Sequence, residues 1–91
     1  MPLLLVTYDL KTSLKDYASL FEGIKKNSKF WWHYLESVWL VDTWHDENGL
    51  AKALYPHITK EDRLLVISTR DTGQGWLPKE AWDWIIEHQS G

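Results

Sequence analysis

Residues 30–43 read FWWHYLESVWLVDT, and this stretch decides which fold the chain can adopt. Aromatic and β-branched side chains dominate it, which is the composition of β-strands. The stretch is longer than one typical strand, so it must divide. Only the polar pair Glu36-Ser37 offers a place for a tight turn or bulge. We therefore predict two antiparallel strands joined at that pair without a glycine hairpin.

Upstream of this pair, the pattern predicts a strand and then a helix. Residues 3–9 are a short apolar run that ends in Tyr-Asp, which indicates a strand buried on both faces. A helix follows, capped by Thr12 or Ser13 and ending near Asn27, a residue that tolerates the left-handed conformation of a C-cap. Its apolar stripe consists of Tyr17, Leu20, Phe21 and Ile24.

Downstream, a shorter helix fits residues 47–55 because Pro56 stops it, and residues 63–70 predict another buried strand. The element order is therefore β-α-β-β-α-β, the split βαβ arrangement of ferredoxin-like α+β folds. In such a sandwich two helices cover one face of a four-stranded antiparallel sheet. The other face is left bare.

The C-terminal residues add one more helix to this predicted fold. Pro78 is well placed at its first position, and the apolar stripe continues to about His88. We therefore predict a single ferredoxin-like domain over residues 1–91, with residues 76–91 as a C-terminal helical extension.

Composition limits the environment and the partners. The 91 residues include no cysteine, which fits a reducing compartment, and no run long and apolar enough for a membrane span. We expect a cytoplasmic protein without membrane contact. The net charge of −3 argues against a strongly basic nucleic-acid footprint. Seven tryptophans are more than one small core can easily cover, which favours a homodimer or a protein partner.

Two pairs of motifs carry a resemblance to known families. Residues 6–10 (VTYDL) and 37–39 (SVW) resemble the CRISPR-associated Cas-two family over roughly residues 3 to 69. Residues 31–37 (WWHYLES) and 75–82 (GWLPKEAW) are similar to a SinR-like group of small bacterial and phage proteins placed near that family. The resemblance implies a ferredoxin-like homodimer. This chain departs from it by its acidic charge and its tryptophan-rich C-terminal segment.

The resemblance also implies a candidate metal ligand. Some relatives are described as metal-dependent nucleases that use the aspartate at the end of the first strand, which here is Asp9. One Asp9 carboxylate from each subunit of a dimer would then hold Mg²⁺, because Mg²⁺ keeps several waters and accepts few protein ligands. The alternative is that Asp9 caps the turn into the first helix.

The remaining candidate residues point to binding. Aromatic side chains on an open ferredoxin-like sheet face can stack on single-stranded nucleic acid, or they can form core and dimer interface. The candidates are Trp31, Trp32, Tyr34 and Trp39. His33 would be a general base or a stacking residue if it is exposed. Lys11 and Lys15 form a local basic patch after the first strand.

Two functions follow from these residues. The first is a small homodimeric binding module without catalysis, which engages a protein, a nucleotide-like ligand or nucleic acid through its aromatic surface. The second is a Mg²⁺-dependent endonuclease acting on RNA or DNA, with Asp9 as the metal ligand. The solitary carboxylate and the acidic charge balance favour the first, because a phosphodiester transition state needs concentrated positive charge.

Overall fold

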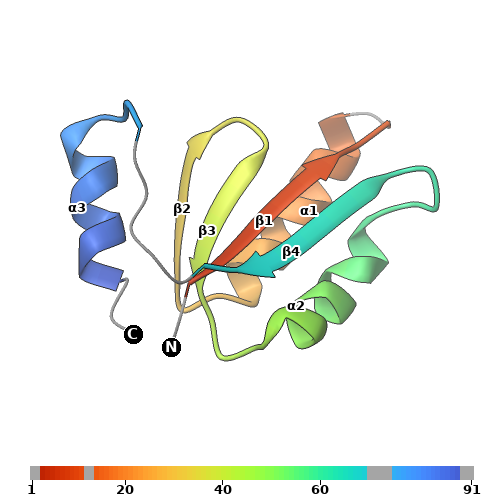
Figure 1. The fold of residues 1–91 in the computed structure, drawn as a ribbon. Helices are drawn as coiled ribbons and strands as arrows, with labels where there is room; N and C mark the ends of the chain where they lie inside the picture. The colour runs from red at the N-terminus through yellow and green to blue at the C-terminus, as the bar shows by residue number, and fades with distance from the viewer. Residues whose placement is uncertain (1–2, 12–13, 70–74, 89–91) are drawn as a thin grey trace.

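The computed structural model describes residues 3–11, 14–69 and 75–88, without the side chains of residues 14–16. Figure 1 shows a sheet with two helices packed behind it and a third helix beside one edge. The elements in chain order are β1 (Leu4–Asp9), α1 (Leu14–Lys26), β2 (Phe30–Leu35), β3 (Val38–Asp42), α2 (Glu47–Leu54), the 3₁₀ turn η1 (Tyr55–His57), β4 (Arg63–Ser68) and α3 (Lys79–His88).

The four strands form one sheet in the order β2-β3-β1-β4, and every neighbouring pair is antiparallel. The first strand of the chain therefore lies in the middle of the sheet, and β2 and β4 are its edges (Figure 1). This architecture confirms the predicted α+β class. The chain segments that join β1 to β2 and β3 to β4 contain α1 and α2.

The division of residues 30–43 is confirmed. β2 ends at Leu35, β3 begins at Val38, and Glu36-Ser37 forms the turn between them. The pairing of the two strands shifts between Trp32 and Leu35, which is the bulge that a tight turn without glycine requires.

The hydrophobic core lies between the sheet and the helices α1 and α2. Its fully buried members come from all of these elements and include Val6, Leu20, Ile24, Trp39, Val41, Leu50 and Leu54. Tyr17 and Phe21 pack against it from α1, so the predicted apolar stripe of this helix is confirmed. The helices are held on the sheet chiefly by this shared burial of apolar surface.

The ends of the helices use side-chain hydrogen bonds. The Asp46 carboxylate caps α2 by accepting the backbone N–H of Gly49 at 2.7 Å. The helix α1 ends at Lys26, which confirms the predicted end near Asn27. Asn27 does not adopt the left-handed conformation, since no described residue other than glycine has a positive φ. Instead, the side-chain amide of Asn27 donates to the carbonyl oxygen of Gly23 at 2.8 Å. The predicted caps at Thr12 and Ser13 lie outside the described residues.

Two strands are less buried than their apolar sequences predict. In β1 the side chains alternate, so that Leu4, Val6 and Tyr8 are buried while Leu5 and Thr7 are half-buried. β4 is an edge strand whose Leu65 and Ile67 are 51% and 44% exposed. Both strands therefore bury the face that meets the helices. The face on the other side of the sheet, here called the open face, is only partly covered.

The helix α3 covers the β2 end of the open face (Figure 1). Its buried residue is Ala81, whose backbone oxygen accepts the indole N–H of Trp32 at 3.1 Å. The Phe30 ring lies 4.9 Å from the His88 ring, measured between centroids. Trp32 is thereby reduced to 3% exposure. The predicted C-terminal helix is present, and it packs on the chain's own sheet.

Candidate functional site

Asp9 ends β1 at the surface, with a side chain that is 68% exposed. Its Oδ2 atom lies 3.4 Å from the Nζ atom of Lys11, and Arg63 is its partner across the β1–β4 pairing. An exposed pair of this kind contributes at most about 1 kcal/mol and is screened by salt. The surroundings of Asp9 are thus cationic, which suits a carboxylate in an ion pair.

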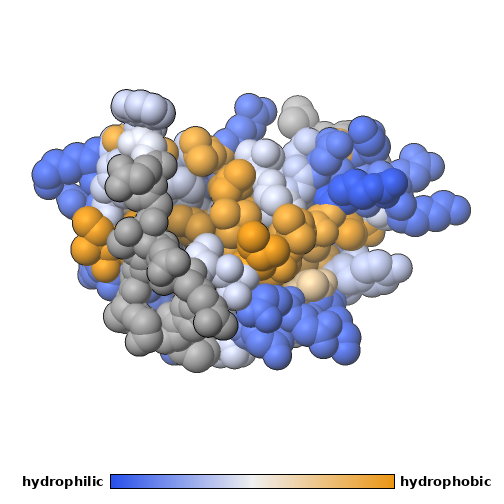
Figure 2. Space-filling model, in the orientation of Figure 1, coloured by the Kyte–Doolittle hydropathy of each residue, from blue (hydrophilic) through white to orange (hydrophobic). Residues whose placement is uncertain are grey.

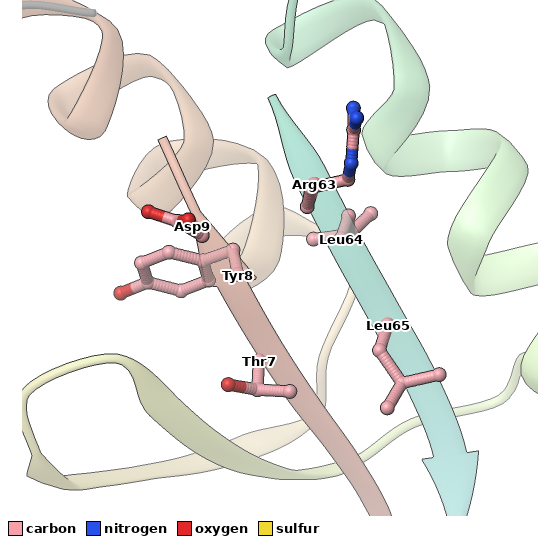
Figure 3. A pocket seen from close by; sticks show the side chains of 6 residues that line it. All are labelled: Thr7, Tyr8, Asp9, Arg63, Leu64 and Leu65. Atoms are coloured by element: carbon pink, nitrogen blue, oxygen red, sulfur yellow. The ribbon is translucent and has the colours of Figure 1, made fainter. Parts of the chain in front are cut away.

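Two shallow hollows flank the end of β1, and Asp9 borders both. The first has a volume of about 280 Å³ and is lined by Thr7, Tyr8, Asp9, Arg63, Leu64 and Leu65. Figure 3 shows Thr7 and Leu65 on neighbouring strands of this hollow, with Asp9 toward the strand end. The second has about 370 Å³ and is lined by Tyr8, Asp9, Tyr17, Glu36 and Ser37.

The described residues bring no set of metal ligands to Asp9. Among residues 3–11, 14–69 and 75–88, no three histidine or carboxylate side chains gather closely enough to hold an ion. A Mg²⁺ ion at Asp9 would therefore take its remaining oxygen ligands from water, from a second copy or from the residues outside this description.

Asp62 is a buried carboxylate that the sequence analysis did not single out. Its Oδ2 accepts the backbone N–H of Thr59 at 2.8 Å, and its Oδ1 accepts the backbone N–H of Lys11 at 2.9 Å. It therefore joins the segment after β1 to the loop before β4. The hydrogen bonds from Thr59 and then Lys11 hold the pKa of Asp62 below its usual value of 3.8, because they favour the ionised form.

This shift predicts a loss of stability in acid. Asp62 binds a proton more readily in the unfolded chain, so its contribution is complete above a pH of about 4 and is lost as the pH falls through the lower folded pKa. We expect Asp62→Asn to melt below the wild type at pH 7 and to lose less of its stability on acidification. Melting curves between pH 2 and pH 7 measure both effects.

The control for this experiment is Glu61→Gln, which removes one negative charge from an exposed neighbour of Asp62. Equal effects of the two substitutions would show that net charge, and not the hydrogen bonds of Asp62, sets the acid response.

A hydrogen-bonded chain joins the core to the turn between β2 and β3. The indole N–H of Trp39 donates to the Tyr8 hydroxyl at 3.0 Å, and this hydroxyl donates to the backbone oxygen of Glu36 at 3.3 Å. Burial raises the pKa of the Tyr8 hydroxyl above its usual value of 10.0. Tyr8 thus stays neutral near pH 7. Its hydrogen bond to Glu36 holds the turn between β2 and β3, which borders the second hollow.

The four aromatic candidates divide between surface and core. Trp31 and Tyr34 are exposed, and the Lys25 ammonium lies 4.9 Å from the centre of the Trp31 ring. Trp32 is buried under α3, and Trp39 is buried in the core at 1% exposure. The four rings therefore do not form one accessible platform. Alternation along β2 places Trp31 and Trp32 on opposite faces of the sheet.

His33 packs against the core and is only half-buried. Its ring stacks on Trp39 with a centroid distance of 3.9 Å and an interplanar angle of 14°. Its Nε2 atom lies 3.0 Å from the carbonyl oxygen of Glu36, so Nε2 carries the proton in this contact. In the neutral ring the lone pair then lies on Nδ1, so only Nδ1 could accept a proton as a general base.

The two basic candidates do not form a described patch. Lys11 is paired with Asp9, as above. Lys15 belongs to α1, but its side chain lies outside the described part of the structure.

The open face carries two apolar rows across the strands. Strand pairing aligns Trp32, Leu40, Leu5 and Ile67 in one row and Val38, Thr7 and Leu65 in the next. Figure 2 shows apolar side chains gathered over the middle of this face, with hydrophilic residues around them. The helix α3 covers Trp32, so the first row becomes more exposed toward β4. The second row begins at Leu35 on β2, opposite Val38, and is about half exposed at both ends, Leu35 and Leu65.

Comparisons with known proteins give no relative for this chain. No family model, no curated protein and no solved structure matches it. Within the described residues, no helix has the length and apolar character needed to cross a membrane. The site must therefore be interpreted from its geometry.

Proposed function

We propose that the chain is a small homodimeric binding module of ferredoxin-like fold, which acts without catalysis and binds a protein partner through its open sheet face. The observation that carries this proposal is the pair of apolar rows on that face, which end on Leu65 and Ile67 at about half exposure. Exposed contiguous apolar surface of this kind marks interaction sites in soluble proteins.

The strand arrangement supports the ferredoxin-like part of the proposal. β1 lies between β3 and β4, and each segment with a helix joins two strands that have one strand between them. This connectivity supports the split βαβ arrangement predicted from the element order. The relationship to the SinR-like and Cas-two families, the cytoplasmic location and the homodimer are proposed with it, on the sequence motifs and composition.

The distribution of tryptophans adds support for a partner. Trp31, Trp44 and Trp76 are exposed, and Trp76 reaches 99%. Tryptophan is enriched at the energetic centres of protein interfaces, because it offers a large apolar surface together with one hydrogen-bond donor. These rings are exposed in the single chain, so we propose that they contact other protein surfaces.

The alternative of a Mg²⁺-dependent endonuclease stays a prediction. It would require Asp9 to leave its pairing with Lys11 or to join a second carboxylate from another copy. No described observation favours that arrangement over the binding module, and Mg²⁺ chemistry at Asp9 rests on the family resemblance alone.

A homodimer is the first testable consequence. Light scattering at micromolar concentration is expected to give about twice the chain mass of 10.8 kDa. The expectation follows from the exposed apolar residues Leu65 and Ile67 at the β4 edge, because burying such surface favours association. A species that keeps the single-chain mass over this concentration range would contradict the homodimer.

Cleavage assays distinguish the two functions. Wild-type protein with Mg²⁺ and a panel of RNA and DNA substrates is expected to leave every substrate intact. Cleavage that Asp9→Ala abolishes, while that variant keeps the wild-type melting temperature, would replace the binding module with the endonuclease. Cleavage that persists in Asp9→Ala would instead indicate a contaminant or another site.

A further inference from the structure

The outer edge of β4 offers unused backbone hydrogen-bonding groups. The N–H of Thr69 donates to the carbonyl oxygen of Leu3 at 2.9 Å, so Thr69 faces β1. Backbone groups in an antiparallel pair alternate in direction, and those of Leu64, Val66 and Ser68 therefore face away from β1. No hydrogen bond joins these outward groups to any other described residue.

This edge also lacks the features by which proteins prevent an edge strand from pairing with another chain. Residues 64–69 contain no charged residue, proline or glycine, and the β1–β4 pairing has no register shift. An apolar, regular edge is a template for pairing with another strand. The opposite edge differs, because the β2–β3 pairing is bulged and α3 lies beside β2.

We infer that β4 pairs with the β4 strand of a second copy, antiparallel about a twofold axis at Val66, to form one continuous sheet across the dimer. This inference rests on the homodimer proposed above and specifies how it is built. The outward groups of each strand then bond to those of the other, with Leu64 opposite the partner's Ser68. A twofold pairing uses the same edge on both chains, so it closes without leaving a free β4 edge.

The same register is self-complementary in its side chains. It places Leu65 opposite the partner's Ile67 on the open face, and Ile67 opposite the partner's Leu65. Each apolar row of one chain thus continues into a row of the other, and cross-strand apolar pairs of this kind stabilise sheets. The charged residue Arg63 lies opposite the partner's Thr69, so like charges do not meet.

Disulfide cross-linking tests the edge and its register in this cysteine-free chain. In the inferred pairing the two Cα atoms of residue 66 are about 5.5 Å apart, within the range that a disulfide spans. We expect Val66→Cys to give a covalent dimer on mild oxidation. The matched control is Leu64→Cys on the same strand and face, whose two copies would be about 14 Å apart and should stay unlinked. Cross-linking of Leu64→Cys but not of Val66→Cys would overturn the register.

A second variant tests the edge by removing one outward donor. Proline is tolerated where the N–H of a strand faces outward, so Ser68→Pro should keep the wild-type circular dichroism and become monomeric in light scattering. If Ser68→Pro is folded and dimeric, and Val66→Cys does not cross-link, the β4 pairing is wrong while the homodimer stands. If the wild type is monomeric, both proposals fail. If Ser68→Pro does not fold, the cysteine pair decides.

Discussion

Replacing Trp39 with alanine is expected to lower the free energy of unfolding by about 3–5 kcal/mol, the usual cost of deleting a large buried aromatic side chain. Small domains are stable by only about 5–15 kcal/mol, so the variant would be folded marginally or not at all. Thermal unfolding followed by circular dichroism should show a melting temperature at least about 12 °C lower.

The size of this effect follows from the contacts of Trp39. Its ring stacks on His33, meets the edge of Phe21 at a centroid distance of 5.1 Å, and is almost completely buried. Its indole N–H is the donor to the Tyr8 hydroxyl. Alanine at this position therefore leaves a cavity and removes the first hydrogen bond of the chain that reaches Glu36.

The matched control is Trp31→Ala, which removes the same side chain from an exposed position on the neighbouring strand. It should cost about 1–2 kcal/mol, through the lost contacts with Lys25 and with the Trp39 ring, which lies at a centroid distance of 5.3 Å. Equal melting temperatures for the two variants would show that Trp39 does not hold the core together.

A chain that ends at Gly75 is expected to lose about 2–3 kcal/mol of stability and to aggregate, because it uncovers Trp32 and the adjoining end of the open face. Melting temperature and light scattering of the shortened chain measure this directly. Soluble, dimeric material with the wild-type melting temperature would show that residues 76–91 are an appendage.

Substitutions in the full-length chain test whether α3 depends on its packing against the sheet. Ala81→Asp places a carboxylate in the buried contact with Trp32, whereas Ile86→Asp makes an acidic substitution on the same helix at a position that is 70% exposed. We expect Ala81→Asp alone to abolish hydrogen-exchange protection over residues 79–88. Loss of protection in both variants would mean that helix stability, and not the contact with Trp32, was disturbed.

Trp84 shows how well the spacing of apolar residues predicts burial in the C-terminal helix. The spacing of apolar residues predicts that Trp84 lies on the packed side of the C-terminal helix, and the helix is where the pattern places it. The fully buried residue is nevertheless Ala81, while Trp84 is half-buried and stacks on His88 with a centroid distance of 4.1 Å. A small residue brings the helix closest to the sheet, which a hydrophobicity pattern weighs too lightly.

The candidate site was predictable only in part. Asp9 at the end of the first strand and the exposed Trp31 follow from local sequence, because a strand end and an alternating face are local properties. Asp62 does not follow from it. The segment before β4 has the polar composition of a turn, and nothing in it indicates that the carboxylate accepts the N–H of Lys11, which is 51 positions away.

The succession of strands and helices and the division of residues 30–43 at Glu36-Ser37 follow from the sequence alone. These features depend on side-chain periodicity, chain stiffness and turn chemistry, which act over a few residues. The sequence did not reveal that Leu65 and Ile67 on β4 are half exposed or that α3 covers Trp32, because these features come from the tertiary packing. An apolar run predicts that both faces of a strand are buried, but it does not show which neighbouring element covers each face. That choice depends on contacts between residues far apart in the chain, and within the described residues Leu65 and Ile67 stay about half exposed.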